Sequence, residues 1–596
     1  MNRPAPPEIK ADKAQTVERN TPMTRQDALK NPTDRPSFAW LGTYPDGIDW
    51  HDPIPERPLY TLIDDAVASH PEIVCTNFLG RKQTYKQTGV KVNEAAAALQ
   101  KLGIKKGMRV GLLLPNTPTY VVYYFAILKV GGIVVNFNPL YTHDELAFQA
   151  RDSGVELMVT LDLKTLCDKV ETLIAEGILP RAIIASFTGL LPGTKAALYK
   201  LFKARDLARP LASPVTDRLI IEADVLERGS MPDPVDISPR QDLAVLQYTG
   251  GTTGTPKGAM LTHYNVYANA EQISRWSPHL VAGEERFLGV LPFFHVFAMT
   301  VVMNCAIRKA STMVILPRFE LMAALRLIQQ TKPTVMPAVP TLFNAILNCP
   351  QAKKFDLSSL KYCLSGGAPL PITVKEQFEA LTGCSVVEGY GLSEAAPVVT
   401  ANAVAGPVRA GSIGMPLPLT IVSLRDLEDP SREVAQGEKG EICVSGPQVM
   451  PGYWQRPDET ADVFTPDGFL RTGDVARMDP DGMFSIEDRI KDLIICSGYN
   501  VYPRQVEDAI YTYHKVAEVT VIGIPDDYRG EAPKAFIKLK DGEVATTEEI
   551  FTHLAKKLSK IELPAQIEFR DELPKTMIGK LSKKELRQAE LEKLKS

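Results

Sequence analysis

The sequence predicts an α/β protein. It consists of a large N-terminal domain of stacked α/β layers, a small β-barrel-like section and a small mobile α+β C-terminal domain. Three observations lead to this prediction. From about residue 60, short apolar runs bounded by turn residues alternate with helical patterns, as in parallel sheets covered by helices. After about Gly411, short segments rich in Gly, Pro and Asp replace this alternation. A charged stretch, DRIKD (488–492), then precedes a last segment with its own helix and strand signals.

The first part of the chain shows the alternation most clearly. The apolar run RVGLLL (109–114) ends at Pro115-Asn116 and predicts a buried strand. Thr142 and Glu145 form a capping box, in which the Thr oxygen and the Glu carboxylate satisfy free N–H groups at a helix start. That helix is expected to end near Ser153-Gly154. The other elements expected here are a helix over 118–129 and strands over 133–136 and 157–160, and the alternation resumes at 244–248 and from 312 to 389.

The later part of the chain predicts the smaller units. Short strands are expected at IGMPLP (413–418), GEICVSG (440–446) and DGMFSIED (481–488). A domain junction is expected near Arg489, which divides the chain into an N-terminal AMP- and acyl-binding domain (38–489) and a C-terminal AMP-binding domain (490–596). Residues 1–37 are polar and Pro-rich without an apolar stretch, so they are expected to be a disordered tail and not a secretory signal.

The composition limits the class of protein. The chain has 596 residues, 44% hydrophobic and 23% charged, with a net charge of −4, which is ordinary for a soluble globular protein and unlike a nucleic-acid binder. The eight cysteines are dispersed and form no CxxC pair or zinc-like cluster, so we expect reduced thiols in the cytoplasm. Two apolar stretches, 121–135 and 290–307, are interrupted by Lys129, Gly131, Pro292 or His295. We therefore interpret them as buried core elements and not as spanning helices.

The motif YTGGTTGTPKG (248–258), directly after an apolar strand, carries the most chemistry. Its glycines let backbone N–H groups approach a polyphosphate, its threonines add donors, and Lys257 adds a positive charge. It is not a Walker A loop, because no Lys-Ser or Lys-Thr pair follows the second glycine at the required spacing. Taken alone, a Gly/Thr-rich surface turn is the alternative.

Three further motifs are weak alone. EGYGLSE (388–394) could hold a flat base and a cation, or could be a strand–turn–helix start capped by Ser393. Tyr453-Trp454 and then FLRTGD (469–474) follow, and Asp474 could accept from ribose hydroxyls or close a turn. PKTMIGK (574–580) places Lys580 after a glycine, where it could neutralise a phosphate or simply be solvated.

In this order and spacing, the four motifs resemble those of the acyl-adenylate-forming superfamily of AMP-binding enzymes, over essentially the whole chain beyond the tail. Within it, the stretch GGIVVNFNPLYTHDEL (131–146) and the insert at 191–209 look like bacterial long-chain fatty acyl-CoA synthetases. Two departures are that Ser393 stands where the family usually has Thr, and Gly251 where it often has Ser. Neither change touches a charged group.

The resemblance implies the following site roles. The β- and γ-phosphates of ATP are held by Thr249, Gly250, Gly251, Thr252, Thr253, Gly254, Thr255 and Lys257, with Thr249 near the metal. Adenine is enclosed by Gly366, Gly367, Ala368, Glu388, Gly389, Tyr390 and Gly391. By the same resemblance, Ser393 contacts the α-phosphate, Glu394 binds Mg²⁺, and Asp474 and Arg489 hold the ribose. Lys580 bridges the acid and the α-phosphate, and His295 lies beside the carboxylate of the acid. Lys491 marks the hinge, and Ser497 and Gly498 line the path of the pantetheine group.

The resemblance therefore implies a long-chain fatty acid–CoA ligase that uses ATP, Mg²⁺ and coenzyme A. The alternatives are a ligase for medium-chain or aromatic acids, an acyl-AMP ligase that delivers to a carrier protein, and a non-catalytic nucleotide-binding protein. The insert at 191–209 combines apolar and basic residues at helical spacing, so it is either a peripheral helix on the inner face of the membrane or a surface helix packed on the core. A homodimer is also left open, and no nucleic-acid partner is expected.

Overall fold

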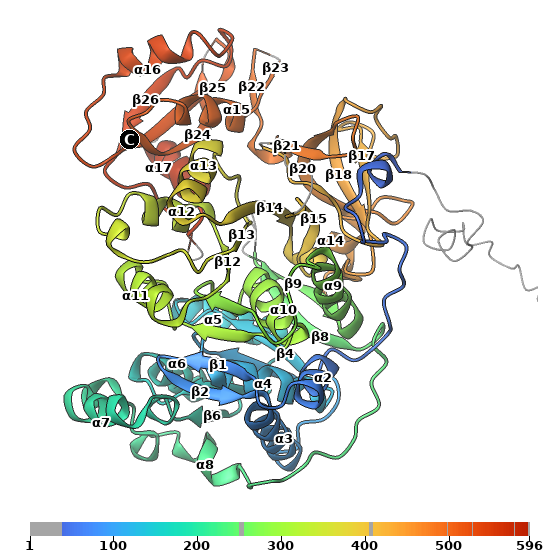
Figure 1. The fold of residues 1–596 in the computed structure, drawn as a ribbon, viewed down its shortest axis with the longest axis vertical. Helices are drawn as coiled ribbons and strands as arrows, with labels where there is room; N and C mark the ends of the chain where they lie inside the picture. The colour runs from blue at the N-terminus through green and yellow to red at the C-terminus, as the bar shows by residue number, and fades with distance from the viewer. Residues whose placement is uncertain are drawn as a thin grey trace, which may run out of the picture. The chain divides into compact units, whose positions relative to one another are not determined.

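The structure is a computed structural model that describes residues 38–249, 255–404, 409, 411–497, 499–526, 528–576 and 579–593. Residues Phe38–Ser596 form one compact unit. The tail expected at 1–37 lies outside the described residues. Figure 1 shows the two large sheets with their helices, the smaller antiparallel sheet and the C-terminal segment.

The first large sheet has eight strands in the order β19-β9-β8-β4-β3-β5-β6-β7. Its centre is parallel, whereas β9 pairs antiparallel with both β8 and β19. The Gly/Thr-rich motif begins in β8 and ends in β9, and its residues 250–254 lie outside the described residues. The strands are β3 (Arg109–Leu113), β4 (Ile133–Phe137), β5 (Leu157–Leu161), β6 (Ala182–Ala185), β7 (Leu219–Ile221), β8 (Leu243–Thr249), β9 (Lys257–Thr262) and β19 (Gly452–Tyr453).

The second large sheet has nine strands in the order β16-β15-β14-β13-β12-β10-β11-β1-β2. Its central strands are parallel, and an antiparallel strand or hairpin lies at each edge. The strands are β1 (Val74–Phe78), β2 (Arg81–Thr84), β10 (Arg286–Gly289), β11 (Thr312–Ile315), β12 (Val335–Ala338), β13 (Tyr362–Ser365), β14 (Ser385–Gly391), β15 (Val398–Ala401) and β16 (Met415–Pro416).

Two smaller sheets follow. The first is antiparallel, in the order β17-β18-β20-β21, and is built from β17 (Ile421–Arg425), β18 (Lys439–Ser445), β20 (Leu470–Met478) and β21 (Phe484–Arg489). The C-terminal sheet is built from β22 (Ile494–Cys496), β23 (Tyr499–Val501), β24 (Val516–Asp526), β25 (Gly530–Leu539) and β26 (Gln566–Phe569). A single 3₁₀ turn, η9 (Ile490–Asp492), connects the two. The C-terminal sheet has a hydrophobic core of its own, which includes Val506, Val521, Ile537 and Leu554.

The helices cover the sheets. The longer ones are α2 (Thr61–Ser69), α3 (Tyr85–Lys101), α4 (Pro118–Lys129), α5 (His143–Ser153), α6 (Lys164–Ala175), α7 (Gly193–Phe202), α9 (His263–Trp276), α11 (Leu321–Thr331), α12 (Pro340–Leu347), α13 (Ile372–Thr382), α15 (Pro503–Tyr511), α16 (Thr547–Leu554) and α17 (Lys583–Lys593). The shorter ones are α8 (Glu222–Val225), α10 (Cys305–Arg308) and α14 (Pro457–Asp462). Helix α4 is buried on nearly every side, which explains its almost continuous apolar sequence.

The structure confirms the predicted α/β fold class and most of the predicted elements. Thr142 and Glu145 form the expected capping box of α5, and Gly154 ends that helix in the left-handed conformation. The strands expected near 109, 133, 157 and 244 are β3, β4, β5 and β8.

Two predicted segments differ from the structure, and a third, 290–307, is buried as expected but has a helix type that the sequence did not predict. Residues 413–418 were expected in the small β section, but β16 pairs with β15 and extends the nine-stranded sheet. The insert at 191–209 is helical only as far as Phe202, and a 3₁₀ turn follows (Ala204–Asp206). The stretch at 290–307 contains a fully buried π-helix, η6 (Ala298–Asn304), followed by α10. Among the described residues, no helix is both long and apolar enough to cross a membrane.

Candidate active site

Lys580 reaches a small cavity between the C-terminal segment and the nine-stranded sheet. His295 and Ala298 line this cavity with Lys580, together with Leu291, Pro292, Phe297 and Val339. The cavity is about 10 Å³, which is room for one water molecule. The sequence analysis placed Lys580 and His295 at the same reacting carboxylate, and the structure brings these two residues to one cavity although they are far apart in the chain.

A tight turn aims Lys580 into the cavity. The Lys580 amide donates to Thr576 Oγ1 (3.1 Å), and the Thr576 amide donates to the Lys580 carbonyl (2.6 Å). Thr341 on α12 donates its hydroxyl to the Gly579 carbonyl (2.7 Å), which ties the turn to the nine-stranded sheet. A Cβ at Gly367 would lie 2.7 Å from Lys580 Cε, so this position must lack a side chain for Lys580 to pass.

The cavity has one cationic side chain, Lys580, beside one neutral imidazole ring, His295. Burial and the neighbouring Arg489 lower the pKa of Lys580 to about 8. Burial and the charge of Lys580 lower the pKa of His295 to about 3, so this imidazole is neutral at physiological pH. Among the described residues, no hydrogen bond or ion pair involves the Lys580 ammonium group, which is therefore available to an anionic ligand.

Tyr390, Asp474 and Arg489 form a second cluster. Asp474 and Arg489 lie opposite each other on β20 and β21, and Arg489 Nε lies 3.0 Å from Asp474 Oδ1. Tyr390 at the end of β14 donates its hydroxyl to Asp474 Oδ2 (2.6 Å). Asp474 raises the pKa of Arg489, and burial raises that of Tyr390. A carboxylate can accept about four hydrogen bonds, so Asp474 keeps capacity for a ligand hydroxyl.

Glu388 supports the loop that follows β13. Its Oε2 accepts the Leu370 amide (3.1 Å), which closes the loop containing Gly366, Gly367 and Ala368. Burial raises the pKa of Glu388 to about 7. Gly389 and Gly391 lie beside it in β14, and β13 and β14 are adjacent parallel strands. The two segments predicted to enclose adenine therefore lie side by side, although Glu388 uses its carboxyl group within the protein.

Glu394 and Lys257 both contact the side chain of Tyr453. Tyr453 donates its hydroxyl to Glu394 Oε1 (2.7 Å), and Lys257 Nζ lies 5.2 Å from the centre of the same ring. Ser393 and Glu394 belong to a 3₁₀ turn, η8 (Ser393–Ala395), which packs against β9. The carboxylate predicted to bind a metal ion and the lysine predicted to bind phosphate therefore belong to one site.

The other predicted residues are placed less directly. Thr249 ends β8 opposite Lys257, and Thr255 is exposed just before β9. Lys491 is exposed in η9. Ser497 is exposed in the turn between β22 and β23, with its amide donated to Arg529, and it lines no part of the Lys580 cavity. Five loop residues, Gly250, Gly251, Thr252, Thr253 and Gly254, and also Gly498, lie outside the described residues.

Sequence reasoning gave no role to Tyr453 and did not find Thr341 or Leu370. Tyr453 was visible as half of a Tyr-Trp pair before an Arg-Pro sequence, but its partners lie about 60 and 200 positions away. Thr341 carries no local signal, because its function depends on the Lys580 turn that docks against it.

The donor set suits Mg²⁺, which prefers carboxylate, hydroxyl and phosphate oxygens. Glu394 offers its second carboxylate oxygen, since only Oε1 is taken by Tyr453 in the described residues, and the Thr249 hydroxyl lies at the base of the phosphate loop. No group of three or more His, Cys, Asp or Glu side chains suited to a metal ion occurs in the part of the chain that the structure describes. A cation here would therefore depend on ligands from a nucleotide.

Comparison with known proteins defines the class. Residues 63–454 match the AMP-binding enzyme family, and residues 505–580 match its C-terminal domain. The chain belongs to the AMP-binding enzyme family. A long-chain-fatty-acid–CoA ligase of Bacillus subtilis is 43% identical over 553 residues, which cover 93% of this chain and 98% of that protein. The enzyme of the same name from Yersinia pestis is 38% identical over 93% of this chain and 98% of that protein.

Solved structures agree with this assignment. ATP-bound MatB from Rhodopseudomonas palustris has a TM-score of 0.76 at 27% identity, over 89% of this chain and 98% of that one. The fatty acyl CoA synthetase of Mycobacterium tuberculosis has a TM-score of 0.65 at 26% identity, over 89% and 98%. The α/β fold predicted from the sequence is thus shared with these enzymes, and the chain is an AMP-forming acyl-CoA synthetase that uses ATP and CoA.

Proposed function

We propose that the chain is a long-chain fatty acid–CoA ligase with two half-reactions. In the first, a fatty acid and ATP give acyl-AMP and pyrophosphate. In the second, acyl-AMP and CoA give acyl-CoA and AMP. The observation that carries the proposal is the cavity in which the Lys580 ammonium, without a protein partner among the described residues, faces His295 and the 366–368 loop. The near full-length likeness to enzymes named long-chain-fatty-acid–CoA ligases supports the substrate class.

The residues of the cavity fit the first half-reaction. A carboxylate oxygen of the acid attacks the α-phosphorus, and the bond to the bridging oxygen of pyrophosphate breaks. Such a reaction depends on positioning and charge neutralisation more than on a protein nucleophile. Lys580 would pair with the acid and the α-phosphate, and neutral His295 would add a polar group beside the carboxylate without a competing charge. Ser393 would donate to the α-phosphate from η8.

The nucleotide would be held by the two other clusters. Asp474 and Arg489 would hold the ribose hydroxyls, and the 366–368 and 388–391 segments would enclose adenine. The described part of the phosphate loop, Thr249, Thr255 and Lys257, would contact the β- and γ-phosphates. Mg²⁺, held by Glu394 and Thr249 together with phosphate oxygens, would supply neutralisation of the polyphosphate charge.

The second half-reaction needs a different arrangement of the C-terminal segment. The CoA thiolate attacks the acyl carbon, and AMP leaves with the former carboxylate oxygen. Ser497, predicted to line the pantetheine path, is exposed and does not line the Lys580 cavity. We therefore infer a rotation of the C-terminal domain (490–596) about the hinge at Lys491, which would withdraw Lys580 and bring the turn at Ser497 to the acyl group.

A long acyl chain requires the cavity to open, because about 10 Å³ cannot hold it. Ala298 lines the cavity, whereas Thr300 points away and donates its hydroxyl to the Ala396 carbonyl (2.7 Å). Ala298→Trp should therefore shift the preference of kcat/KM toward shorter acids. Thr300→Trp is the weaker probe, since it would disrupt a buried hydrogen bond. A profile of Ala298→Trp equal to that of the unmodified chain would exclude Ala298 from the acyl path.

The proposed reaction is tested by its products. Pyrophosphate release should require ATP and a fatty acid, and acyl-CoA should appear by mass spectrometry only when CoA is added. A panel of acids from C4 to C18, with benzoate included, should give the highest kcat/KM for long chains, because each buried methylene contributes about 0.8 kcal/mol. A maximum at C4 or benzoate would contradict the long-chain assignment. Acyl-AMP without acyl-CoA would instead favour delivery to a carrier protein.

A peripheral membrane contact through α7 is part of the proposal. No residue of α7 is buried, and its apolar side chains are open to solvent: Leu198 is 55% exposed, Leu201 72% and Phe202 76%. Lys200, Lys203 and Arg205 lie among them. Figure 1 shows α7 at the β6–β7 edge of the sheet. An exposed apolar group ringed by lysines and arginines suits an anionic lipid surface.

Vesicle binding tests this contact. Leu201→Ser with Phe202→Ser should abolish co-sedimentation with anionic vesicles, and Gln at Lys200, Lys203 and Arg205 should weaken it most at low salt. Val544→Ser is the matched control, because Val544 is equally exposed (76%) in the C-terminal segment. Equal sedimentation of all variants would exclude α7 as the contact. The homodimer that the sequence leaves open is a separate question, which sedimentation equilibrium would test.

A further inference from the structure

Residues 450–456, which include the Tyr-Trp pair noted in the sequence, connect the two halves of the phosphate site. We call this segment the strap. Its strand, β19, pairs antiparallel with β9, with Gly452 opposite Met260 and Tyr453 opposite Ala259. Because β9 begins at Lys257, the strap runs beside the strand that leaves the Gly/Thr-rich loop.

The strap holds Glu394 at two points. The Met450 amide donates to the Glu394 carbonyl (2.8 Å), and the Tyr453 hydroxyl donates to Glu394 Oε1 (2.7 Å). Tyr453 is only 9% exposed, and its phenol hydroxyl is a donor at physiological pH. A hydroxyl on Oε1 sets the rotation of the carboxylate and leaves Oε2 for a cation.

The same segment holds the phosphate loop. Lys257 Nζ lies over the Tyr453 ring at 5.2 Å from its centre, a cation–π distance. The Trp454 amide donates to the Gly258 carbonyl (2.8 Å). Tyr453 therefore contacts both groups proposed to serve the polyphosphate. Its ring contacts Lys257, and its hydroxyl contacts Glu394.

Asp152 at the end of α5 anchors this arrangement. Its carboxylate accepts from Arg456 Nη2 (2.5 Å) and from the Tyr248 hydroxyl (2.6 Å), and its carbonyl accepts from Trp454 Nε1 (3.2 Å). Tyr248 precedes the Gly/Thr-rich loop, and Trp454 and Arg456 belong to the strap. Both sides of the loop are thus tied to one residue of the eight-stranded layer.

We propose that Tyr453 is a positioning residue for the first half-reaction: its hydroxyl orients Glu394 toward the cation while its ring holds Lys257 at the polyphosphate. The inference rests on the proposed function, because it takes Glu394 and Lys257 to serve magnesium-bound ATP. The inference adds that Tyr453, which lies outside the proposed acid and adenine sites, sets the positions of Glu394 and Lys257. Substitution of Tyr453 should therefore change the KM for magnesium-ATP and leave the KM for the fatty acid unchanged.

Tyr453→Phe tests the hydroxyl alone, because the ring remains over Lys257. We expect KM for magnesium-ATP in acyl-AMP formation to rise about tenfold, the effect of losing one hydrogen bond to a charged group. KM for the fatty acid and thioester formation from supplied acyl-AMP should stay unchanged. Tyr453→Leu, which also removes the ring, should give a larger rise.

Tyr264→Phe is the matched control. Tyr264 is buried, donates its hydroxyl to the Ile54 carbonyl (3.4 Å) and carries Arg240 over its ring at 4.0 Å, but lies outside the site. Its kinetics should equal those of the unmodified chain. The melting temperatures of both Phe variants show whether folding is intact, and a change in KM for magnesium-ATP at an unchanged melting temperature supports the positioning role.

A double-variant cycle with Glu394→Gln decides whether Tyr453 acts through Glu394. If it does, adding Tyr453→Phe to Glu394→Gln should change KM for magnesium-ATP by much less than tenfold. Fully additive effects would overturn the inference, as would a Tyr453→Phe variant with unchanged KM beside an impaired Glu394→Gln. If Glu394→Gln itself leaves the magnesium dependence unchanged, the proposed metal role of Glu394 fails, and the inference fails with it.

Discussion

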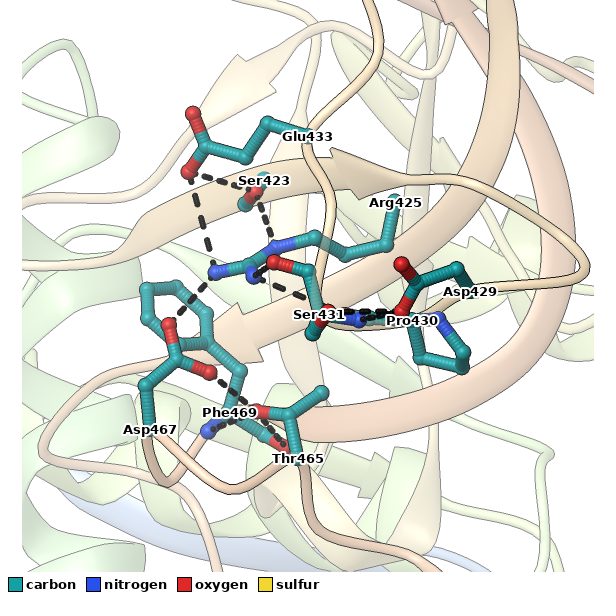
Figure 2. A network of polar contacts seen from close by, with 9 residues as sticks. All are labelled: Ser423, Arg425, Asp429, Pro430, Ser431, Glu433, Thr465, Asp467 and Phe469. Atoms are coloured by element: carbon teal, nitrogen blue, oxygen red, sulfur yellow. Dashed lines mark hydrogen bonds and ion pairs between the residues drawn. The ribbon is translucent and has the colours of Figure 1, made fainter.

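Two arginine clusters in this molecule, one buried and one half exposed, have opposite characters. Arg425 in the small antiparallel sheet is 3% exposed, and its guanidinium donates hydrogen bonds to neighbouring protein groups (Figure 2). It donates to Ser423 Oγ (2.8 Å), Asp467 Oδ2 (2.7 Å) and the Ser431 carbonyl (3.2 Å), and it stacks on the Phe469 ring at 5.0 Å. Within the described part of the chain, Arg489 has one ion pair, with Asp474, and about half of its side chain is exposed (49%).

The difference indicates that Arg425 stabilises the fold, whereas Arg489 serves ligand binding. The Arg425 guanidinium joins two loops, 426–433 and 465–469, and its donors are taken up by the protein. Around Arg489 the neighbouring Lys580 ammonium has no partner among the described residues, and its pKa is lowered by burial and by the nearby Arg489 cation. Two cations with only one carboxylate, Asp474, beside them are unfavourable unless an anionic ligand joins them. Substitutions in the first cluster should therefore affect stability, and in the second activity.

Lys580→Ala should give the largest effect. Acyl-AMP formation should fall by about 10²–10³, the typical loss when one donor aimed at transition-state charge is removed. Thioester formation from supplied acyl-AMP should be largely retained, and the melting temperature should not fall, since Lys580 has no ion pair with any of the described residues. Lys575→Ala is the control, because Lys575 lies in the same loop but pairs with Glu518 (2.7 Å). Equal loss in both half-reactions would contradict the assigned role of Lys580.

Arg425→Ala should show the reverse pattern. Removing one partner of a buried charge network costs about 3–5 kcal/mol, so the midpoint of denaturant unfolding should fall clearly. The kcat/KM of the folded fraction for fatty acid should remain that of the unmodified chain. Arg432→Ala, which removes an exposed arginine paired with Asp426 in the same loop, should change stability by less than about 1 kcal/mol. A loss of activity without a loss of stability would break the distinction between the clusters.

Glu394→Gln should give an intermediate effect on activity. The neutral amide keeps the size of the side chain but is a poorer ligand for a hard cation, so the Mg²⁺ concentration for half-maximal adenylation should rise about tenfold or more. Glu428→Gln, at an exposed position in the loop after β17, serves as the control. Titration of adenylation with Mg²⁺ at fixed ATP measures the change. An unchanged titration would exclude Glu394 as a ligand.

The pH dependence should give the smallest effect within one pH unit of the Lys580 pKa. The ammonium form of Lys580 is required, and its folded-state pKa is lowered to about 8, so the positive charge is lost as the pH rises through that value. The kcat/KM for ATP should therefore decline above about pH 8, by about tenfold per unit. Lys580→Arg keeps its charge, so any remaining activity should lack this decline. A flat profile of the unmodified chain up to about pH 9.5 would contradict the charged role.

Much of the fold could be predicted because its signals are local. The strand at 109–114 ends at Pro-Asn, and the helix after Thr142 has both halves of its capping box within four residues. Segment 413–418 was misassigned because its Gly- and Pro-rich composition resembles that of the small sheet. Its partner, β15, is determined by a long-range pairing (Thr400 with Pro416). The π-helix at Ala298–Asn304 has no sequence signature, since helices of either pitch bury a continuous apolar run equally well.

The candidate site shows the same limit. Its charged residues could be identified because their motifs contain glycines and charges in unusual combinations, as at Lys257 and Lys580. The contacts that orient them could not be predicted. Thr341 and Asp152 look ordinary in sequence and gain importance only from residues more than 90 positions away. The roles of individual site residues therefore stay predictions. The family and the fold are confirmed by the comparisons and the structure.

The most direct test of the account is the fate of the carboxylate oxygens. The chain is supplied with a long-chain fatty acid labelled with ¹⁸O in its carboxylate, together with ATP, Mg²⁺ and CoA, and the AMP is analysed by mass spectrometry. Attack of the carboxylate on the α-phosphorus followed by release from the acyl carbon predicts one ¹⁸O atom in each AMP and none in pyrophosphate. Unlabelled AMP, or label in free phosphate with ADP as product, would contradict an acyl-adenylate intermediate.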